Sequence, residues 1–257
     1  MNKTGQHVFD PNFLLLIALG CAATGAALQI GLGVGFSMLA APSVIAMLGV
    51  EAALGALLGL NLLVSCIGMT GRRDAAYGAS STGPNRWTAV SSLAGVAIGA
   101  ATLGYLPVQF LLTATGVAIL LGALSPRTDT AGQGLRSGTV QMIACTGGLI
   151  TSWTATPGPI FALGLAWAGA EAKSIPRLIQ PVAATAYGAA FALLGPTGWV
   201  SLASIEGLPW LLLATACGAI AGLWVRGWLP AGTILPGLRL LAVVGGTGLL
   251  VEALSQT

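Results

Sequence analysis

Long apolar runs recur along the whole of this 257-residue chain, and very few charges interrupt them. Only 7% of the residues are charged and 55% are hydrophobic, whereas a water-soluble domain carries about 25% charged residues. A chain with so few charges cannot coat a soluble surface, so lipid must be the solvent for most of it. The 38 glycines agree, because glycine is more frequent in membrane helices than in soluble ones. The sequence therefore predicts an all-α polytopic membrane protein.

Ten apolar segments are expected to form its helices. About twenty residues are needed to cross a bilayer as a helix, and the second and seventh segments are shorter than that. Gly or Pro also interrupts the approach to each of these two, so we expect broken or re-entrant helices there. The segments cover residues 12–30, 34–49, 51–69, 87–104, 107–124, 137–154, 157–170, 175–195, 208–225 and 233–254.

The two halves of the chain resemble each other at a fixed distance. A shift of 123 residues lays residues 104–107, Gly-Tyr-Leu-Pro, on residues 227–230, Gly-Trp-Leu-Pro. An offset that holds from the first segment of each half to its last predicts a duplication. The same shift pairs Trp87 with Trp210, Gly25 with Gly148, Gly35 with Gly158, Gly95 with Gly218 and Gly99 with Gly222.

The duplication predicts one membrane domain, 1–257, with a first repeat at about 12–124 and a second at about 135–254. Each repeat holds an odd number of crossings, whether or not its first two segments form a re-entrant hairpin. The second repeat therefore enters the membrane from the opposite side, which is the inverted-repeat plan of many secondary transporters. Because the first apolar segment has a later counterpart, we expect a retained helix rather than a cleaved signal peptide.

The basic residues predict the orientation. Nine of the ten Lys and Arg residues fall in the loops and helix ends on one side, and only Lys3 lies opposite. The positive-inside rule makes that side cytoplasmic, so both termini of this multi-pass inner-membrane protein are expected in the periplasm. The basic stretches are residues 70–86, 125–136, 171–177 and 226–239.

Metal and acid–base chemistry have few candidate residues. The four cysteines lie in apolar runs without a CxxC spacing, and the one histidine, His7, lies in the N-terminal tail, so we expect buried structural thiols and no metal or cofactor. An intramembrane enzyme would need a nucleophile–base pair, metal ligands or paired carboxylates, and no Asp, Glu or His lies in the centre of any segment. A proton relay has no obvious path either. The membrane potential could drive an outward anion flux, and Glu51 is the alternative as a proton site.

Two helix breaks stand at corresponding places in the two halves, at residues 29–37 and 152–159. In the second, Thr156 is placed to cap a helix whose first turn holds Pro157. N–H groups at a helix start, with the positive end of its dipole, form an anion site without a charged side chain. In inverted halves the two breaks would meet near the midplane of the membrane. The alternative is that the glycines only permit close helix packing.

Polar groups beside the breaks are expected to complete the site, because an unpaired polar group in lipid is costly. Each could instead form an interhelical hydrogen bond. Trp153 could lie over an organic tail or pack against the core, and Arg177 could attract anions from the cytosol or anchor its helix at the headgroups. The predicted substrate-binding residues are Gln29, Gly33, Gly35, Ser37, Asn61, Trp153, Thr154, Thr156, Gly158, Arg177 and Gln180.

These residues resemble a known family. The run Gly31–Ser37 (Gly-Leu-Gly-Val-Gly-Phe-Ser) with Pro42, Asn61, the run Thr156–Pro159 and Arg177 is similar to the TauE/SafE sulfite-exporter family. The likeness covers both repeats. It implies export of sulfite or a short organosulfonate across the bacterial cytoplasmic membrane, and the inverted broken helices favour a secondary transporter that works by alternating access. A small-anion channel is the alternative, and a structural or assembly factor would not need the paired breaks.

Small-residue faces predict close helix contacts. Gly95 and Gly99, mirrored by Gly218 and Gly222, let helix backbones approach each other. They would join either the two halves of one chain or two protomers of a homodimer, and the sequence does not choose. The expected partners are the lipid bilayer and a small anionic substrate, and we expect no nucleic acid.

Overall fold

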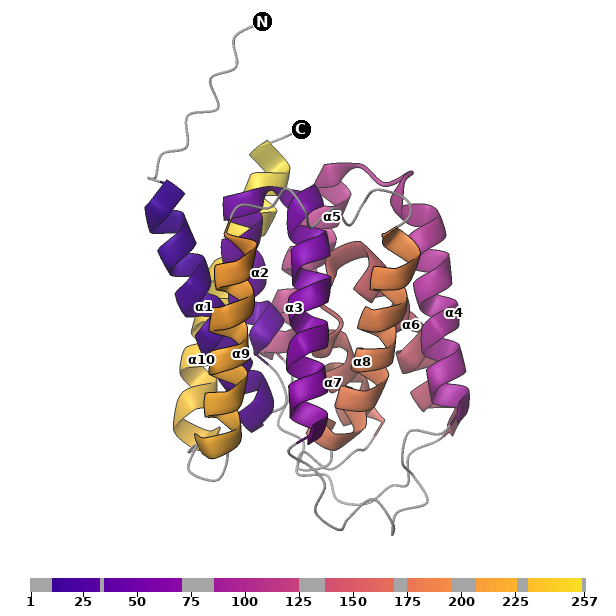
Figure 1. Cartoon of the computed structure of the whole chain (residues 1–257). Coiled ribbons are helices and arrows are strands. Elements are labelled where there is room, and N and C mark those ends of the chain that lie inside the picture. The colour runs from indigo at the N-terminus through magenta and orange to yellow at the C-terminus, as the bar shows by residue number, and fades with distance from the viewer. Residues whose placement is uncertain are drawn as a thin grey trace, which may run out of the picture.

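The computed structural model describes residues 11–32, 35–70, 86–124, 137–168, 175–195, 207–225 and 231–255. These residues form ten α-helices and contain no strand, which confirms the all-α prediction (Figure 1). Each predicted apolar segment coincides with one helix to within three residues at either end. The helices are α1 (Pro11–Leu32), α2 (Phe36–Leu48), α3 (Val50–Thr70), α4 (Arg86–Leu103), α5 (Val108–Leu124), α6 (Ser137–Thr154), α7 (Gly158–Trp167), α8 (Ile175–Leu194), α9 (Leu208–Val225) and α10 (Ala231–Ser255).

Three of the described helices, α1, α3 and α9, are long and apolar enough to cross a bilayer, as expected for a membrane protein. By contrast, α2 has 13 residues and α7 has 10. At 1.5 Å per residue these helices are only about 20 and 15 Å long, against a hydrocarbon core about 30 Å thick. Neither can span the membrane alone, as their sequences predict. Large apolar side chains such as Trp224, Leu240 and Leu254 are exposed on the outside, where lipid would cover them.

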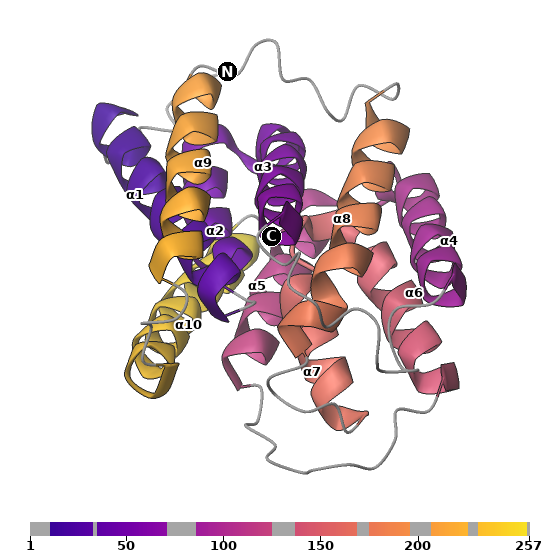
Figure 2. The same ribbon diagram turned by 60° about the horizontal axis from the view of Figure 1, so that its bottom comes forward.

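Helices of the first half pack mainly on helices of the second half. α1 lies beside α9, α4 beside α6, and α5 beside α10. Figures 1 and 2 show the α1–α9 pair on one side of the bundle and the α4–α6 pair on the other, with α3 and α8 between them. α1 begins and α10 ends at one end of the bundle, and α3 ends and α4 begins at the opposite end (Figure 1).

The predicted small-residue faces lie inside these pairs. A Cβ atom at Gly99 of α4 would stand 2.7 Å from the carbonyl oxygen of Leu149 in α6, and one at Gly222 of α9 would stand 2.7 Å from that of Ala27 in α1. Only glycine lets the backbones approach this closely. Of the two roles that the sequence leaves open, these faces therefore join helices within one chain.

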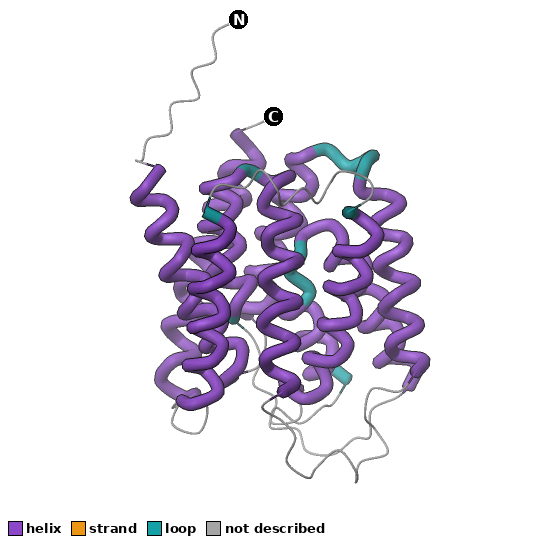
Figure 3. Tube along the Cα trace, viewed as in Figure 1, coloured by secondary structure: helices purple, strands orange, loops and turns teal. Residues whose placement is uncertain are grey.

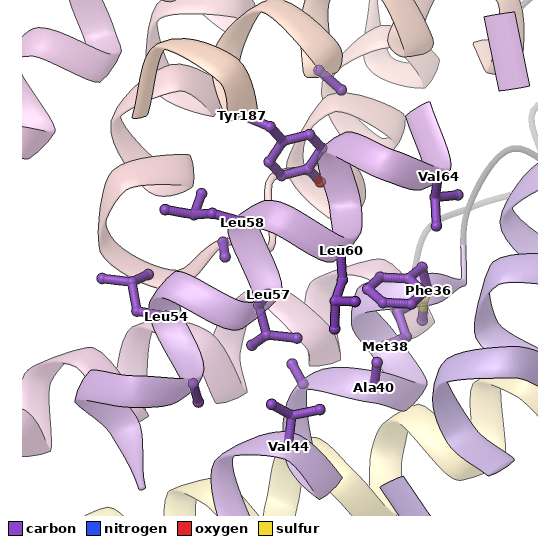
Figure 4. Close-up of a cluster of buried hydrophobic side chains, with 14 of the residues drawn as sticks. Phe36, Met38, Ala40, Val44, Leu54, Leu57, Leu58, Leu60, Val64 and Tyr187 are labelled. Carbon is purple, nitrogen blue, oxygen red and sulfur yellow. The ribbon is translucent and has the colours of Figure 1, made fainter. Parts of the chain in front are cut away.

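The core is centred on α3. Six consecutive residues of this helix, Ala53 to Leu58, are buried, so its middle is covered on all sides. Figure 4 shows Leu57 and Leu60 of α3 next to Phe36 and Val44 of α2, with Tyr187 of α8 above them. The central helix thus contacts the short helix of the first half and α8 of the second.

Candidate functional site

Both predicted breaks are present, and each has unusual backbone geometry. Gly35 precedes α2 with φ 140° and ψ −31°, a conformation that L-residues with a side chain rarely adopt. Ala155, between α6 and α7, has φ 53°, which costs a non-glycine residue about 1–2 kcal/mol. Figure 3 shows the loop that separates α6 from α7 at mid-height in the bundle. Strain of this kind persists only where the surrounding structure holds it.

Hydrogen bonds join the second break to the first half. The Ala155 carbonyl accepts from Nδ2 of Asn61 at 3.2 Å and from the Ser37 hydroxyl at 3.5 Å. The same hydroxyl proton of Ser37 also has Oδ1 of Asn61 within reach, at 3.1 Å, so Ser37 donates to one of these two oxygens at a time. The remaining amide proton of Asn61 goes to the Leu57 carbonyl of its own helix, 2.9 Å away. Ser37, Asn61 and Ala155, which we call the break cluster, thus tie α2 and α3 to the loop after α6.

A fourth element reaches the break cluster from α8. Tyr187 is fully buried, and its side chain makes a hydrogen bond with Ser37. The sequence did not indicate this residue, because a single tyrosine in an apolar segment is typical of a hydrophobic core position. Ala155 was missed because this residue contributes only its backbone carbonyl, and a pattern of side chains does not predict which backbone carbonyls lie outside a helix.

Two threonines shape the turn itself, but one of them does so differently from the prediction. The Thr154 hydroxyl accepts from the backbone N–H of Thr156 at 3.1 Å and lies 2.7 Å from the Thr156 hydroxyl. Thr156 does not cap α7: the N-cap is Pro157, with no side-chain bond, and the helix begins at Gly158. The second helical residue is Pro159, which lacks one of the N–H groups that a capping side chain would accept.

The other predicted residues of the first break are partly accounted for. Gln29, near the end of α1, accepts from the backbone N–H of Phe36 at 3.3 Å through Oε1. The amide therefore bridges the break and satisfies a donor in the first turn of α2. Gly33 lies outside the described residues.

For three further predicted residues the structure shows no hydrogen bond to the break cluster among the described residues. The Trp153 indole donates to the Gly99 carbonyl at 3.2 Å and to the Thr102 hydroxyl at 3.1 Å, so its one polar atom is engaged on α4. A Cβ atom at Gly158 would meet nothing within 4 Å, so the idea that this glycine permits close packing is wrong. Arg177 belongs to the first turn of α8, and its side chain lies outside the described residues.

Gln180, also predicted, is buried in α8 but is not bonded to the break cluster. It is 1% exposed, and neither atom of its amide group has a hydrogen-bond partner. The same holds for the hydroxyl of Ser65 in α3, which sequence reasoning did not single out. The spacing of Ser65 four residues after Asn61, on the same face of α3, was the available signal.

The interior carries no formal charge in the part of the chain that the structure describes. Every buried polar side chain there is a neutral hydroxyl or amide. No group of His, Cys, Asp or Glu in those residues could hold a metal ion. The four cysteines are free, but Cys21 and Cys145 are only half-buried and Cys66 and Cys217 are exposed, so the prediction of four buried thiols is wrong. Any field at the break cluster comes from backbone and side-chain dipoles.

Comparison with known proteins adds no relative. No family model, no curated protein and no solved structure matches the chain. The resemblance to the sulfite exporters thus rests on the glycine, proline and polar motifs of the sequence.

Proposed function

We propose that this chain is a secondary transporter that exports a small anion, sulfite or a short organosulfonate, across the bacterial inner membrane. The observation that carries the proposal is the junction of two chain breaks in one buried, neutral cluster, Ser37–Asn61–Ala155. Irregular backbone at membrane depth persists only where it packs in protein or lines a cavity. A broken helix in each half, meeting at the centre of the bundle, is the usual plan of a transporter site.

The cluster offers neutral donors of the kind that bind an oxoanion. The Asn61 amide donates to the Ala155 carbonyl, and the Ser37 hydroxyl donates its one proton either to that carbonyl or to Oδ1 of Asn61. That carbonyl therefore stands where an oxygen of the anion would accept the same bonds. Binding would exchange the internal acceptor for the solute, and the loop after α6 would move away as the anion enters. This exchange couples binding to a change of shape, as alternating access requires.

The helix pairing supports inverted repeats. In a duplicated chain α1 corresponds to α6, α4 to α9 and α5 to α10. The α1–α9 contact is then equivalent to the α6–α4 contact, and the α5–α10 contact is equivalent to itself. In α4, Gly95 and Gly99 face the carbonyls of Cys145 and Leu149, and in α9 Gly218 and Gly222 face those of Ala23 and Ala27. Each glycine of α4 is 123 residues from the corresponding glycine of α9, as the sequence predicts. The residues whose carbonyls they face, in α1 and α6, are 122 residues apart.

The N-cap residues of the two short helices are separated by the same shorter distance in the sequence. Gly35 and Pro157, which precede α2 and α7, are also 122 residues apart. We therefore propose a one-residue difference between the halves, which falls after the second break and before α9. In that register Gly35 corresponds to Pro157 rather than to Gly158.

The orientation also belongs to the proposal. Nine of the ten basic residues belong to one side by sequence, and α1 begins at the same end of the bundle where α10 finishes (Figure 1). This arrangement agrees with two periplasmic termini. With a neutral interior, the membrane potential, worth about 2.3 kcal/mol per charge per 100 mV, is a sufficient force for anion export.

Binding and flux measurements on hydroxyl variants test the proposal. Ser37→Ala and Thr156→Val each remove one hydroxyl at the breaks, and Ser92→Ala is the control, because its buried hydroxyl in α4 has no partner. We expect saturable sulfite or methanesulfonate binding to the purified parent, and counterflow in vesicles. The two break variants should lose about 1.5–3 kcal/mol of binding free energy, or roughly 10- to 150-fold in affinity, if the hydroxyl contacts a charged ligand.

Three results would count against it. If the parent binds neither anion, or passes it without saturation or counterflow, the protein is not this transporter. If the parent binds but both break variants fold and bind equally well, the site lies elsewhere. Equal losses in all three variants would mean that the effect belongs to any buried hydroxyl.

A further inference from the structure

The Gln180 side chain is an unexplained polar group inside a membrane protein. It is 1% exposed, and both Nε2 and Oε1 lack a hydrogen-bond partner. Buried amides nearly always have partners, because removal from water without a replacement bond is costly. An amide that is unpaired at both ends therefore indicates a partner absent from this conformation.

Gly68 of α3 lies beside the Gln180 amide. A Cβ atom at Gly68 of α3 would stand 3.4 Å from Oε1 of Gln180 and 3.0 Å from Cδ1 of Ile30 in α1. The glycine thus keeps α3 free of a side chain where the amide lies. Pro181 follows Gln180 within α8 and supplies no N–H to the helix, so the helix can bend there at a low cost.

A second unpaired group lies on the same face of α3. Ser65 is fully buried without a partner, three residues before Gly68 and four after Asn61. Residues at these spacings are neighbours on a helix surface, about 5–6 Å apart between Cβ atoms. On α8, Gln180 and Tyr187 are seven residues apart and share a face in the same way. A polar stripe therefore runs between α3 and α8 from near Thr70 to the break cluster.

Two other buried hydroxyls lack partners, but they differ from this pair. Ser92 lies in α4 and Thr215 in α9, in the helices that pack closely on α6 and α1. A lone hydroxyl, that of Ser65 included, can turn to a carbonyl of its own helix, so an unpaired hydroxyl alone does not indicate a ligand. The two ends of the Gln180 amide, one a donor and one an acceptor, cannot both be satisfied in that way.

The chemistry of the amide selects the ligand. Nε2 donates and Oε1 accepts, and the Ser65 hydroxyl can donate as well. A fully ionised oxoanion only accepts, so it would leave Oε1 unpaired and facing a negative charge. An oxoanion that keeps one proton accepts from Nε2 and Ser65 through its bare oxygens and donates its O–H to Oε1. Hydrogen sulfite has this pattern, and a sulfonate does not.

We infer that Ser65 and Gln180, together with Gly68, form a second binding site for a singly protonated oxoanion, on the path between the Thr70 end of α3 and the break cluster. We call it the seam site. The inference rests on the proposed transport function and adds the protonation state of the solute. An anion arriving from that end meets the seam site before it reaches Ser37 and Asn61.

Binding at two pH values separates the protonated from the ionised ligand. Affinity for sulfite is measured below and above the pKa of hydrogen sulfite, and affinity for methanesulfonate, ionised at both values, is measured beside it. We expect tighter sulfite binding at the lower pH and no pH effect on methanesulfonate. Of the described titratable groups on α3, α8 and the helices packed on them, only Tyr187 is buried, and Glu51, Arg86 and the four cysteines are half-buried or exposed. Protein titration would appear in the methanesulfonate series as well.

Variants then locate the effect. Gln180→Leu and Ser65→Ala should weaken hydrogen sulfite binding about tenfold or more, since a bond to a charged ligand is lost. They should remove the pH dependence and change methanesulfonate affinity less than twofold. Without ligand, Gln180→Leu should melt at a higher temperature than the parent, because an unpaired amide has been removed. Ser92→Ala should bind both anions as the parent does.

The outcomes also distinguish this inference from the proposed function. If Thr156→Val weakens binding of both anions while Gln180→Leu and Ser65→Ala weaken neither, the transport site stands and the seam site is refuted. A lower melting temperature for ligand-free Gln180→Leu would likewise overturn it, since the amide would then be structural. If Gln180→Leu does not fold, Gly68→Ala serves instead: its methyl would stand 3.4 Å from Oε1 of Gln180 and take the place of a ligand beside the amide, so unchanged hydrogen sulfite affinity would refute the site.

Discussion

Gly99→Ala tests the close packing of α4 on α6. The added Cβ would stand 2.7 Å from the Leu149 carbonyl oxygen and 2.8 Å from Cβ of Ser152. Carbon–oxygen contacts of this kind are normally about 3.3–3.6 Å, so the helices must separate by roughly 0.6–0.9 Å. The obstructing oxygen belongs to the backbone of α6 and cannot turn aside as a side chain would.

The separation would also stretch hydrogen bonds between the same helices. Ser152 donates to the Val96 carbonyl at 3.0 Å and Trp153 to the Gly99 carbonyl at 3.2 Å, and both would pass the limit for a hydrogen bond. Overpacking costs about 1–3 kcal/mol, and interhelical bonds in membranes contribute about 0.6 kcal/mol each. Gly99→Ala should therefore be roughly 2–4 kcal/mol less stable than a helix glycine-to-alanine change without a clash.

Gly20→Ala supplies that reference. Gly20 lies in α1, and a Cβ atom there would meet nothing within 4 Å, so the change should stabilise the helix by about 0.4–1 kcal/mol. Unfolding by a denaturing detergent in mixed micelles, followed by tryptophan fluorescence, gives the free energy of unfolding of the parent and of each variant. Gly222→Ala, 2.7 Å from the Ala27 carbonyl, should fall between the other two variants. If Gly99→Ala is as stable as Gly20→Ala, the tight α4–α6 contact is refuted.

Two more predictions concern the break cluster and the orientation. Asn61→Leu removes the donor to the Ala155 carbonyl and the acceptor for Ser37, so the free energy of unfolding should fall by about 1–3 kcal/mol; stability equal to that of the parent would contradict the cluster. On a cysteine-free background, Ser255→Cys at the end of α10 should react with a membrane-impermeant reagent in whole cells, while Thr70→Cys at the end of α3 should not. The reverse labelling would show that the termini are cytoplasmic.

The extent of each helix follows from the sequence because lipid penalises every charge and unpaired backbone group within a span. The sequence predicts α6 at residues 137–154, where the structure has it, since Arg136 ends the apolar run on one side and Pro157 limits the helix on the other. The breaks are equally legible, because Gly35 and Pro157 stand where a helix must end or begin.

The contacts across the breaks cannot be read in the same way. Which residue caps α7 depends on local backbone angles and on the missing N–H of Pro159. The residue-type preference for helix N-caps predicted Thr156, whereas the structure has Pro157. The acceptor of the break cluster is the backbone of Ala155, which looks like any other apolar position. Polar residues such as Asn61 and Gln180 are conspicuous in an apolar segment, but only their distances separate a satisfied residue from an unsatisfied one.

The pairing of α1 with α9 has a consequence for the order in which the protein is made. Ala27 of α1 receives its partner, Gly222, only after another 195 residues have been synthesised. At about 5–20 residues per second, this delay is roughly 10–40 s. During that time the newly inserted α1 exposes its small-residue face to lipid or to the insertion machinery. A ribosome that stops after α5 would therefore release a fragment without this contact.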